Sequence, residues 1–163
     1  MSRADIMLAG NKPLTIALDV SGRSLSGPRF HVSINSAGDV SIDLGGYMEN
    51  QKRLVRSHQK TLSIPNESRS AIRRAVGDSD FFTLPDTIGY MTPDGKEVVL
   101  TVVLGDLTHT VRVHASSLHP DKISADDQIT RFSRLYQEIV DSIEGADPHI
   151  PLMQVPTLQL LDN

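Results

Sequence analysis

Residues 97–114 limit the possible folds of this chain more than any other segment. They form two runs rich in Val, Leu and Thr, in which apolar residues alternate with others, separated by Gly105–Asp106. A glycine at the first position of a two-residue loop supplies the positive φ that a tight hairpin needs, and β-branched residues favour strands. We therefore predict an antiparallel hairpin in which Glu97 lies opposite His114 and one face is apolar.

A second strand pair is predicted before this hairpin. Phe30–Ile34 and Val40–Leu44 both alternate, and Gly38 in the turn between them can take a positive φ. Residues 14–18 alternate in the same way and predict a first strand. Residues 52–64, which carry many basic side chains, are interpreted as a further strand.

Two helices are predicted from the spacing of apolar residues. The first starts after Pro65, with Asn66 as N-cap and Gly77 as the residue that follows its end. The second starts near Ser124, which resembles the first residue of a capping box, and runs to about Glu144. Its apolar residues recur at helical spacing and should face a sheet: Ile129, Phe132, Leu135, Tyr136, Ile139, Val140 and Ile143.

The order of these elements predicts the α+β class. We expect an antiparallel sheet of about five to six strands with two helices packed on one face. Residues 1–13 are interpreted as a leader, 14–147 as a single α+β domain, and 148–163 as a Pro-rich C-terminal arm.

Composition excludes several functional classes. The chain of 163 residues has no cysteine, which removes disulfides, thiolate metal sites and cysteine nucleophiles. Its net charge of −4 argues against nucleic-acid binding. No apolar run reaches the roughly 18 residues of a membrane span, and the short run at 6–9 is a poor signal peptide, which favours a cytoplasmic location. Neither kind of glycine-rich nucleotide-binding loop occurs, so we expect no cofactor.

Three histidines spaced by five residues raise the question of a metal site. The predicted hairpin register places His109 on the apolar face and His114 on the polar face, so the two cannot share an ion. The pair His119 and Asp121 offers too few ligands, and we predict no metal site. We interpret His109 as a hydrogen-bonded histidine at the edge of the core. His114 opposite Glu97 is an ordinary cross-strand pair or, as an alternative, the acid–base pair of a small hydrolase-like enzyme.

Basic residues concentrate in the segment 52–74, which contains a single acid, Glu67. Such an asymmetry in an acidic chain is typical of a surface for an acidic partner, although edge strands also carry basic residues to prevent aggregation. The absence of aromatic residues between Tyr47 and Phe81 argues against base stacking. The candidate partner-binding residues, together with the apolar residues of the arm, are Lys52, Arg53, Arg56, Lys60, Arg69, Arg73, Val155, Leu158 and Leu160.

The stretch from Phe30 to Ile143 resembles a bacterial family known only as a domain of unknown function. The resemblance rests on Asp80–Pro85 (DFFTLP), the following Gly89–Tyr90 and the Thr/Val-rich hairpin. Ser57 stands where members often carry Gly. The resemblance implies the fold class and no activity.

These observations favour a non-enzymatic protein-binding module that acts as an accessory or inhibitory, immunity-type subunit. It would bind an acidic or hydrophobic protein surface through the basic segment, the neighbouring helix or the arm. The alternative is the small hydrolase-like enzyme that uses His114 and Glu97.

Overall fold

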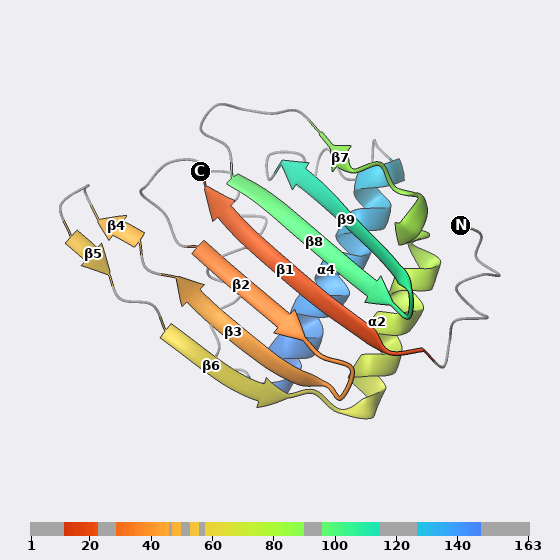
Figure 1. The fold of residues 1–163 in the computed structure, drawn as a ribbon, viewed down its shortest axis with the longest axis horizontal. Coiled ribbons are helices and arrows are strands. Elements are labelled where there is room, and N and C mark those ends of the chain that lie inside the picture. Colours follow the sequence, from red (N-terminus) through yellow and green to blue (C-terminus); the bar gives the residue numbers. More distant parts are fainter. Residues whose placement is uncertain are drawn as a thin grey trace.

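The protein has an α+β fold in which one curved sheet carries both helices on the same side (Figure 1). In the computed structural model, the described residues are 12–22, 29–45, 47–49, 53–55, 58–89, 96–114 and 127–147. The predicted fold class is thus confirmed, and so is the placement of two helices on one face. Residues 1–11 of the predicted leader and the whole predicted arm, 148–163, lie outside these ranges.

The main sheet is larger and less uniform than predicted. It has seven strands in the order β6-β3-β2-β1-β8-β9-β7, whereas the sequence predicted about five to six antiparallel strands. The additional strand, β7 (Thr87–Ile88), pairs in parallel with β9, so the sheet is mixed. A strand of two residues has too little periodicity to be recognised in a sequence. The other strands are β1 (Leu14–Gly22), β2 (Arg29–Ile34), β3 (Asp39–Gly45), β6 (His58–Ser63), β8 (Lys96–Leu104) and β9 (Leu107–His114).

The segment 52–64 does not form the single predicted strand. Its first part contributes β5 (Arg53–Val55), which pairs with β4 (Tyr47–Glu49) in a separate two-stranded ribbon. Its second part is β6, which joins the main sheet beside β3 and forms one of its edges.

Both predicted hairpins are present, and the second has the expected register. Glu97 lies opposite His114 across β8 and β9, and Gly105 in the loop has a φ of +61°. Gly38 in the turn between β2 and β3 has a φ of +88°. The sequence did not predict that β1 lies between the two hairpins, where it pairs with β2 on one side and β8 on the other.

The core lies between the sheet and the helices α2 (Asn66–Asp78) and α4 (Asp127–Ala146). The predicted apolar stripe of α4 is entirely buried. Phe81, in the short 3-10 helix η1 (Phe81–Thr83), is fully buried. Burial raises the pKa of the Tyr136 phenol, and Glu144 adds to this effect, so Tyr136 remains a neutral core residue on which Phe132 stacks.

The ends of α2 differ from the prediction. Pro65, rather than Asn66, occupies the N-cap position and makes no side-chain cap bond. Gly77 lies inside the helix, and the left-handed residue is Asp80, with a φ of +50°. Arg131 of α4 holds this turn, because its guanidinium donates hydrogen bonds to the carbonyl oxygens of Ser79 and Asp80 at 2.6 and 2.7 Å. The contact with Arg131 therefore stabilises the left-handed conformation at Asp80, whereas the sequence suggested that Gly77 would end the helix.

Ser124, the predicted start of α4, lies outside the described ranges.

Neither of the two described α-helices is both long and apolar enough to cross a lipid bilayer.

Candidate functional site

The face of the sheet opposite the helices carries a continuous row of small side chains. No described helix covers this face (Figure 1), which we call the open face. One residue from each of six neighbouring strands lies directly opposite the next across the strand pairs, and every member is small. From β6 to β9 the row consists of Thr61, Ser41, Ser33, Ala17, Thr101 and Thr110. We call it the small-residue row.

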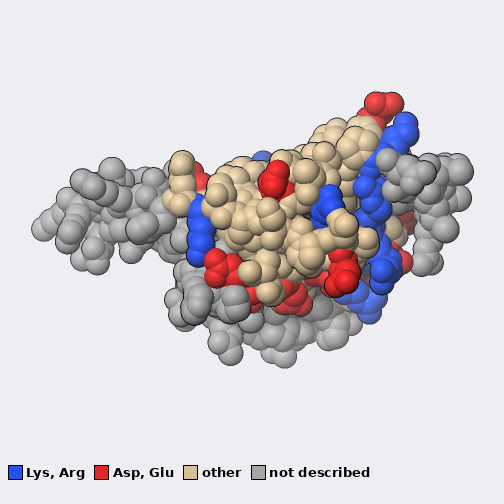
Figure 2. Space-filling model, turned by 90° about the horizontal axis from the view of Figure 1, so that it is seen from below, with Lys and Arg blue, Asp and Glu red and all other residues tan. Residues whose placement is uncertain are grey.

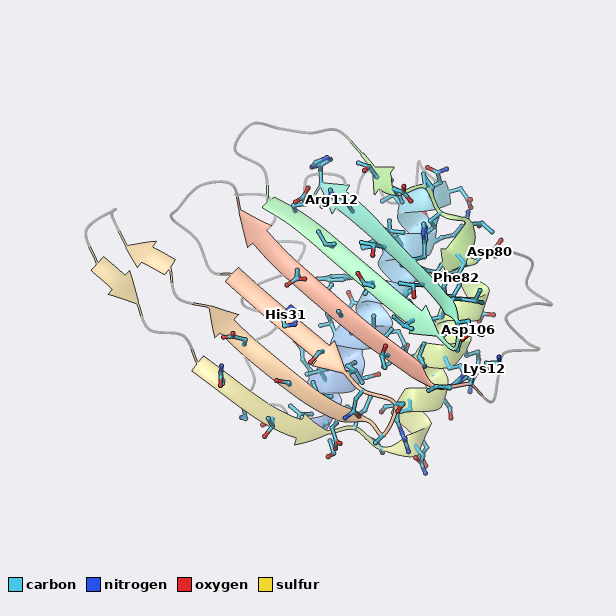
Figure 3. The ribbon with its side chains drawn as sticks, in the orientation of Figure 1. Lys12, His31, Asp80, Phe82, Asp106 and Arg112 are labelled. Carbon is cyan, nitrogen blue, oxygen red and sulfur yellow. The ribbon has the colours of Figure 1, made fainter. Side chains whose placement is uncertain are left out.

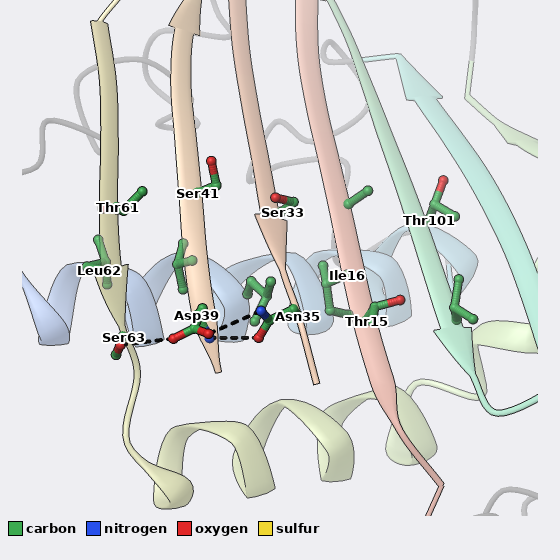
Figure 4. Close-up of a pocket in the computed structure, with 14 residues that line it drawn as sticks. Thr15, Ile16, Ser33, Asn35, Asp39, Ser41, Thr61, Leu62, Ser63 and Thr101 are labelled. Atoms are coloured by element: carbon green, nitrogen blue, oxygen red, sulfur yellow. Dashed lines mark hydrogen bonds between the residues drawn. The ribbon is translucent and has the colours of Figure 1, made fainter. Parts of the chain in front are cut away.

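All members of the small-residue row except Thr110 line a shallow hollow of about 770 Å³. The hollow extends from β6 to β8 and includes Thr15 and Val103 beside the row (Figure 4). A network of hydrogen bonds closes one end: Ser63 Oγ donates to Asp39 at 3.3 Å, and Asn35 Nδ2 donates to the same carboxylate at 3.2 Å. The lining of the hollow is more apolar than polar, and Ser and Thr hydroxyl groups are spread through it.

A row of polar and charged side chains borders the small-residue row on the open face. It places His31 of β2 between Asp19 of β1 and Asp43 of β3. Figure 3 shows His31 on this face. His31 Nδ1 lies 2.5 Å from Asp19 Oδ1, and both side chains are about half exposed. Asp43 Oδ1 is shielded from solvent and has no hydrogen-bond partner among the described residues. A buried acceptor of this kind is costly unless a donor satisfies it.

Glu97 and His114 lie opposite each other as predicted, but Glu97 pairs with a different residue and His114 is buried. Glu97 Oε2 accepts a hydrogen bond from Arg112 Nη1 at 2.7 Å. His114 is only 4% exposed. Arg112 therefore competes for the carboxylate that a His–Glu acid–base pair would need, and a substrate would have to reach a buried imidazole.

His109 has the structural role that the sequence predicted. It faces the helix side of β9, and its Nε2 lies 2.6 Å from the carbonyl oxygen of Leu84. Its ring meets the edge of Phe81, with ring centroids 5.5 Å apart. Within the described ranges, no three metal-ligating side chains come close enough together to hold an ion.

The predicted basic surface is only partly described, and its described members are separated. Lys60 lies in β6 and makes an ion pair of 2.6 Å with Asp147, beyond the end of α4. Arg69 and Arg73 lie on α2 and contact the β2–β3 turn and Lys12 instead. Lys and Arg side chains gather in a band toward the right of Figure 2. Outside the described side chains lie Lys52, Arg53, Arg56, Val155, Leu158 and Leu160.

The sequence reasoning missed the small-residue row. The signal was present strand by strand, because β2, β3, β6, β8 and β9 each carry a Ser or Thr at a position that faces away from the helices. Only the strand order aligns those positions into one row. Comparison with known proteins found no family model that matches the chain and no curated protein that matches it.

Proposed function

We propose that this protein is a non-enzymatic protein-binding module, an accessory or inhibitory subunit, and that its partner binds across the open face of the sheet. The observation that carries this proposal is the small-residue row on a face that no described helix covers. The fold class agrees with the resemblance to a domain of unknown function, which implies no activity of its own.

The shape of the open face suits an extended segment of another protein. Six neighbouring strands spaced about 4.8 Å apart make the small-residue row roughly 24 Å long. Small side chains let the main chain of a partner approach closely, and their hydroxyl groups can both donate and accept hydrogen bonds. The row thus provides length and hydrogen-bonding capacity without an enclosed active-site cavity.

The charges on the open face indicate which side chains a partner would carry. Among the described residues, the carboxylates on this face or at its end are Asp19, Asp39, Asp43 and Glu97. Arg112 neutralises Glu97. Asp43 Oδ1 lacks a donor within the described structure. We therefore propose a partner segment that carries Lys or Arg side chains, since a basic group would supply the missing donor.

The basic segment 52–74, where the sequence suggested an acidic or hydrophobic partner, supports the proposal less well. Each of its three described candidates, Lys60, Arg69 and Arg73, already contacts a group of the protein itself. Those contacts reduce what these residues can offer to a partner.

The test begins with capture of the partner by the tagged full-length protein from its native source at low salt. The captured partner is then purified and titrated by calorimetry against two variants of equal bulk. Thr101→Trp fills the hollow, and Gln137→Trp adds the same side chain to the exposed side of α4. We expect Thr101→Trp to weaken binding at least tenfold and Gln137→Trp to leave it unchanged, with both variants folded by circular dichroism.

Equal affinity of Thr101→Trp and the unmodified protein would overturn the open face as the binding surface. Asp43→Asn sharpens the test, because it should weaken binding and reduce its dependence on salt. A hydrolytic activity that His114→Ala abolishes would instead support the enzymatic alternative.

A further inference from the structure

A second hollow, of about 370 Å³, lies on the helix side of the sheet. One wall is the side of α2 that carries Arg69 and Arg73, and the other includes the β2–β3 turn at Asn35 and Ser36. Residues four apart on a helix share a face, so the two guanidinium groups line the same space. It shares the lining residues Ile16, Ile34 and Asn35 with the hollow on the open face.

Each arginine uses only part of its hydrogen-bonding capacity within the protein. Arg69 Nη1 donates to the carbonyl oxygen of Ser36 at 3.1 Å, and Arg73 Nη2 donates to the carbonyl oxygen of Lys12 at 2.7 Å. Arg69 Nε and Arg73 Nη1 are shielded from solvent and have no acceptor among the described residues. These contacts hold both side chains in place and leave a donor on each without a partner.

The lining of the hollow does not balance the two positive charges. Its other polar side chains are Asn35, Ser36, Asn66 and Ser70, and no carboxylate is among the described residues that line it. Arginine stays charged at every physiological pH, and a shielded charged donor without an acceptor is unfavourable. An anion with several acceptor oxygens would satisfy these donors and offset the charge.

We propose that this hollow is a binding site for a dianionic oxyanion, the phosphate group of a phosphate monoester. A phosphate carries about two negative charges near neutral pH and can accept hydrogen bonds from both arginines at once. Ser70 and Asn66 can donate to its remaining oxygens. A single carboxylate would neutralise only one guanidinium, so the two arginines favour the dianion.

The experiment titrates the full-length protein with inorganic phosphate and with phenyl phosphate, while sodium chloride keeps the ionic strength constant. The readout is the ¹H–¹⁵N signal of the Arg69 Nε–H group, assigned by its loss in Arg69→Lys. We expect this signal to shift saturably with phosphate and not with chloride. Arg73→Gln should weaken the affinity at least tenfold, because it removes one charged donor set.

Arg74→Gln is the matched control, because Arg74 is adjacent in sequence, carries the same charge, is exposed and does not line the hollow. It should bind phosphate as the unmodified protein does. If Arg73→Gln is too unstable to titrate, melting temperatures replace the titration. Phosphate should then raise the melting temperature of the unmodified protein and of Arg74→Gln, but not that of Arg73→Lys. No saturable shift, or equal weakening by Arg74→Gln, would overturn the proposal.

Discussion

The two faces of the sheet come from the same strands but serve different purposes. In β8, Leu100 points to the helices and is fully buried, whereas its neighbour Thr101 lies in the small-residue row on the open face. The helix-covered face is filled with branched aliphatic residues, whereas the open face combines small apolar side chains with hydroxyl and carboxylate groups. The difference teaches that alternation along a strand separates the residues that stabilise the fold from those available for binding.

Leu100→Ala gives the largest expected effect and tests the covered face. Removing a fully buried leucine side chain from the central strands should lower the free energy of unfolding by about 2–5 kcal/mol. Thr101→Ala, one residue away, loses only the 2.8 Å hydroxyl contact with Thr110 and should cost no more than about 1 kcal/mol. Urea denaturation of both variants measures the contrast, and equal losses would contradict the division between the faces.

Arg131→Met tests whether one polar side chain on the helix side behaves as part of the core. The substitution leaves the carbonyl oxygens of Ser79 and Asp80 without the donors that now satisfy them. We expect a loss of about 2–4 kcal/mol in the free energy of unfolding, because partly buried acceptors lose charged donors. Arg134→Met, at an exposed position of the same helix, should change stability by less than about 0.5 kcal/mol. Similar losses in both variants would show that the turn does not depend on Arg131.

Gly38→Ala tests the turn at the end of the sheet. With a φ of +88°, Gly38 has a conformation that other residues rarely adopt, and an added Cβ would lie 2.7 Å from Arg69 Cδ and 3.0 Å from the Ile64 carbonyl oxygen. We expect a loss of about 1–3 kcal/mol in the free energy of unfolding. Gly145→Ala, in α4 with no atom within 4 Å of the added Cβ, should instead stabilise the protein by up to about 1 kcal/mol. Thermal unfolding distinguishes the two, and an unchanged melting temperature for Gly38→Ala would contradict the strain.

The Asp19–His31 pair should show the smallest effect. Both side chains are about half exposed, so water and salt screen their interaction despite the 2.5 Å separation. A double-mutant cycle of Asp19→Asn and His31→Gln should give a coupling energy of about 0.2–1 kcal/mol that falls as salt is added. A coupling above about 2 kcal/mol would mean that polar contacts on the open face contribute to stability in the way that the core does.

Local patterns were sufficient to predict the hairpins, the face of His109 and the buried stripe of α4, because each depends on residues close together in the chain. The burial of His114, predicted on the polar face, did not follow from the alternation of its strand. Patterns were insufficient for β7, for the division of residues 52–64 and for the left-handed Asp80. In the first two cases the pairing partner decides the structure, and in the third case Arg131 from the other helix does.

The sequence identified Arg69 and Arg73 as candidate binding residues but not the hollow that they line, and it did not predict the small-residue row. The sequence by itself determined the period of each strand and helix, and so which side chains of an element share a face. Only the tertiary structure decided that β1 lies between β2 and β8, which places Ala17 opposite both Ser33 and Thr101. It also decided that Arg69 and Arg73 line a hollow against the β2–β3 turn. The physical reason is that side-chain periodicity is a local property of the backbone, whereas the order of strands and the packing of α2 minimise the exposed apolar surface of the whole chain.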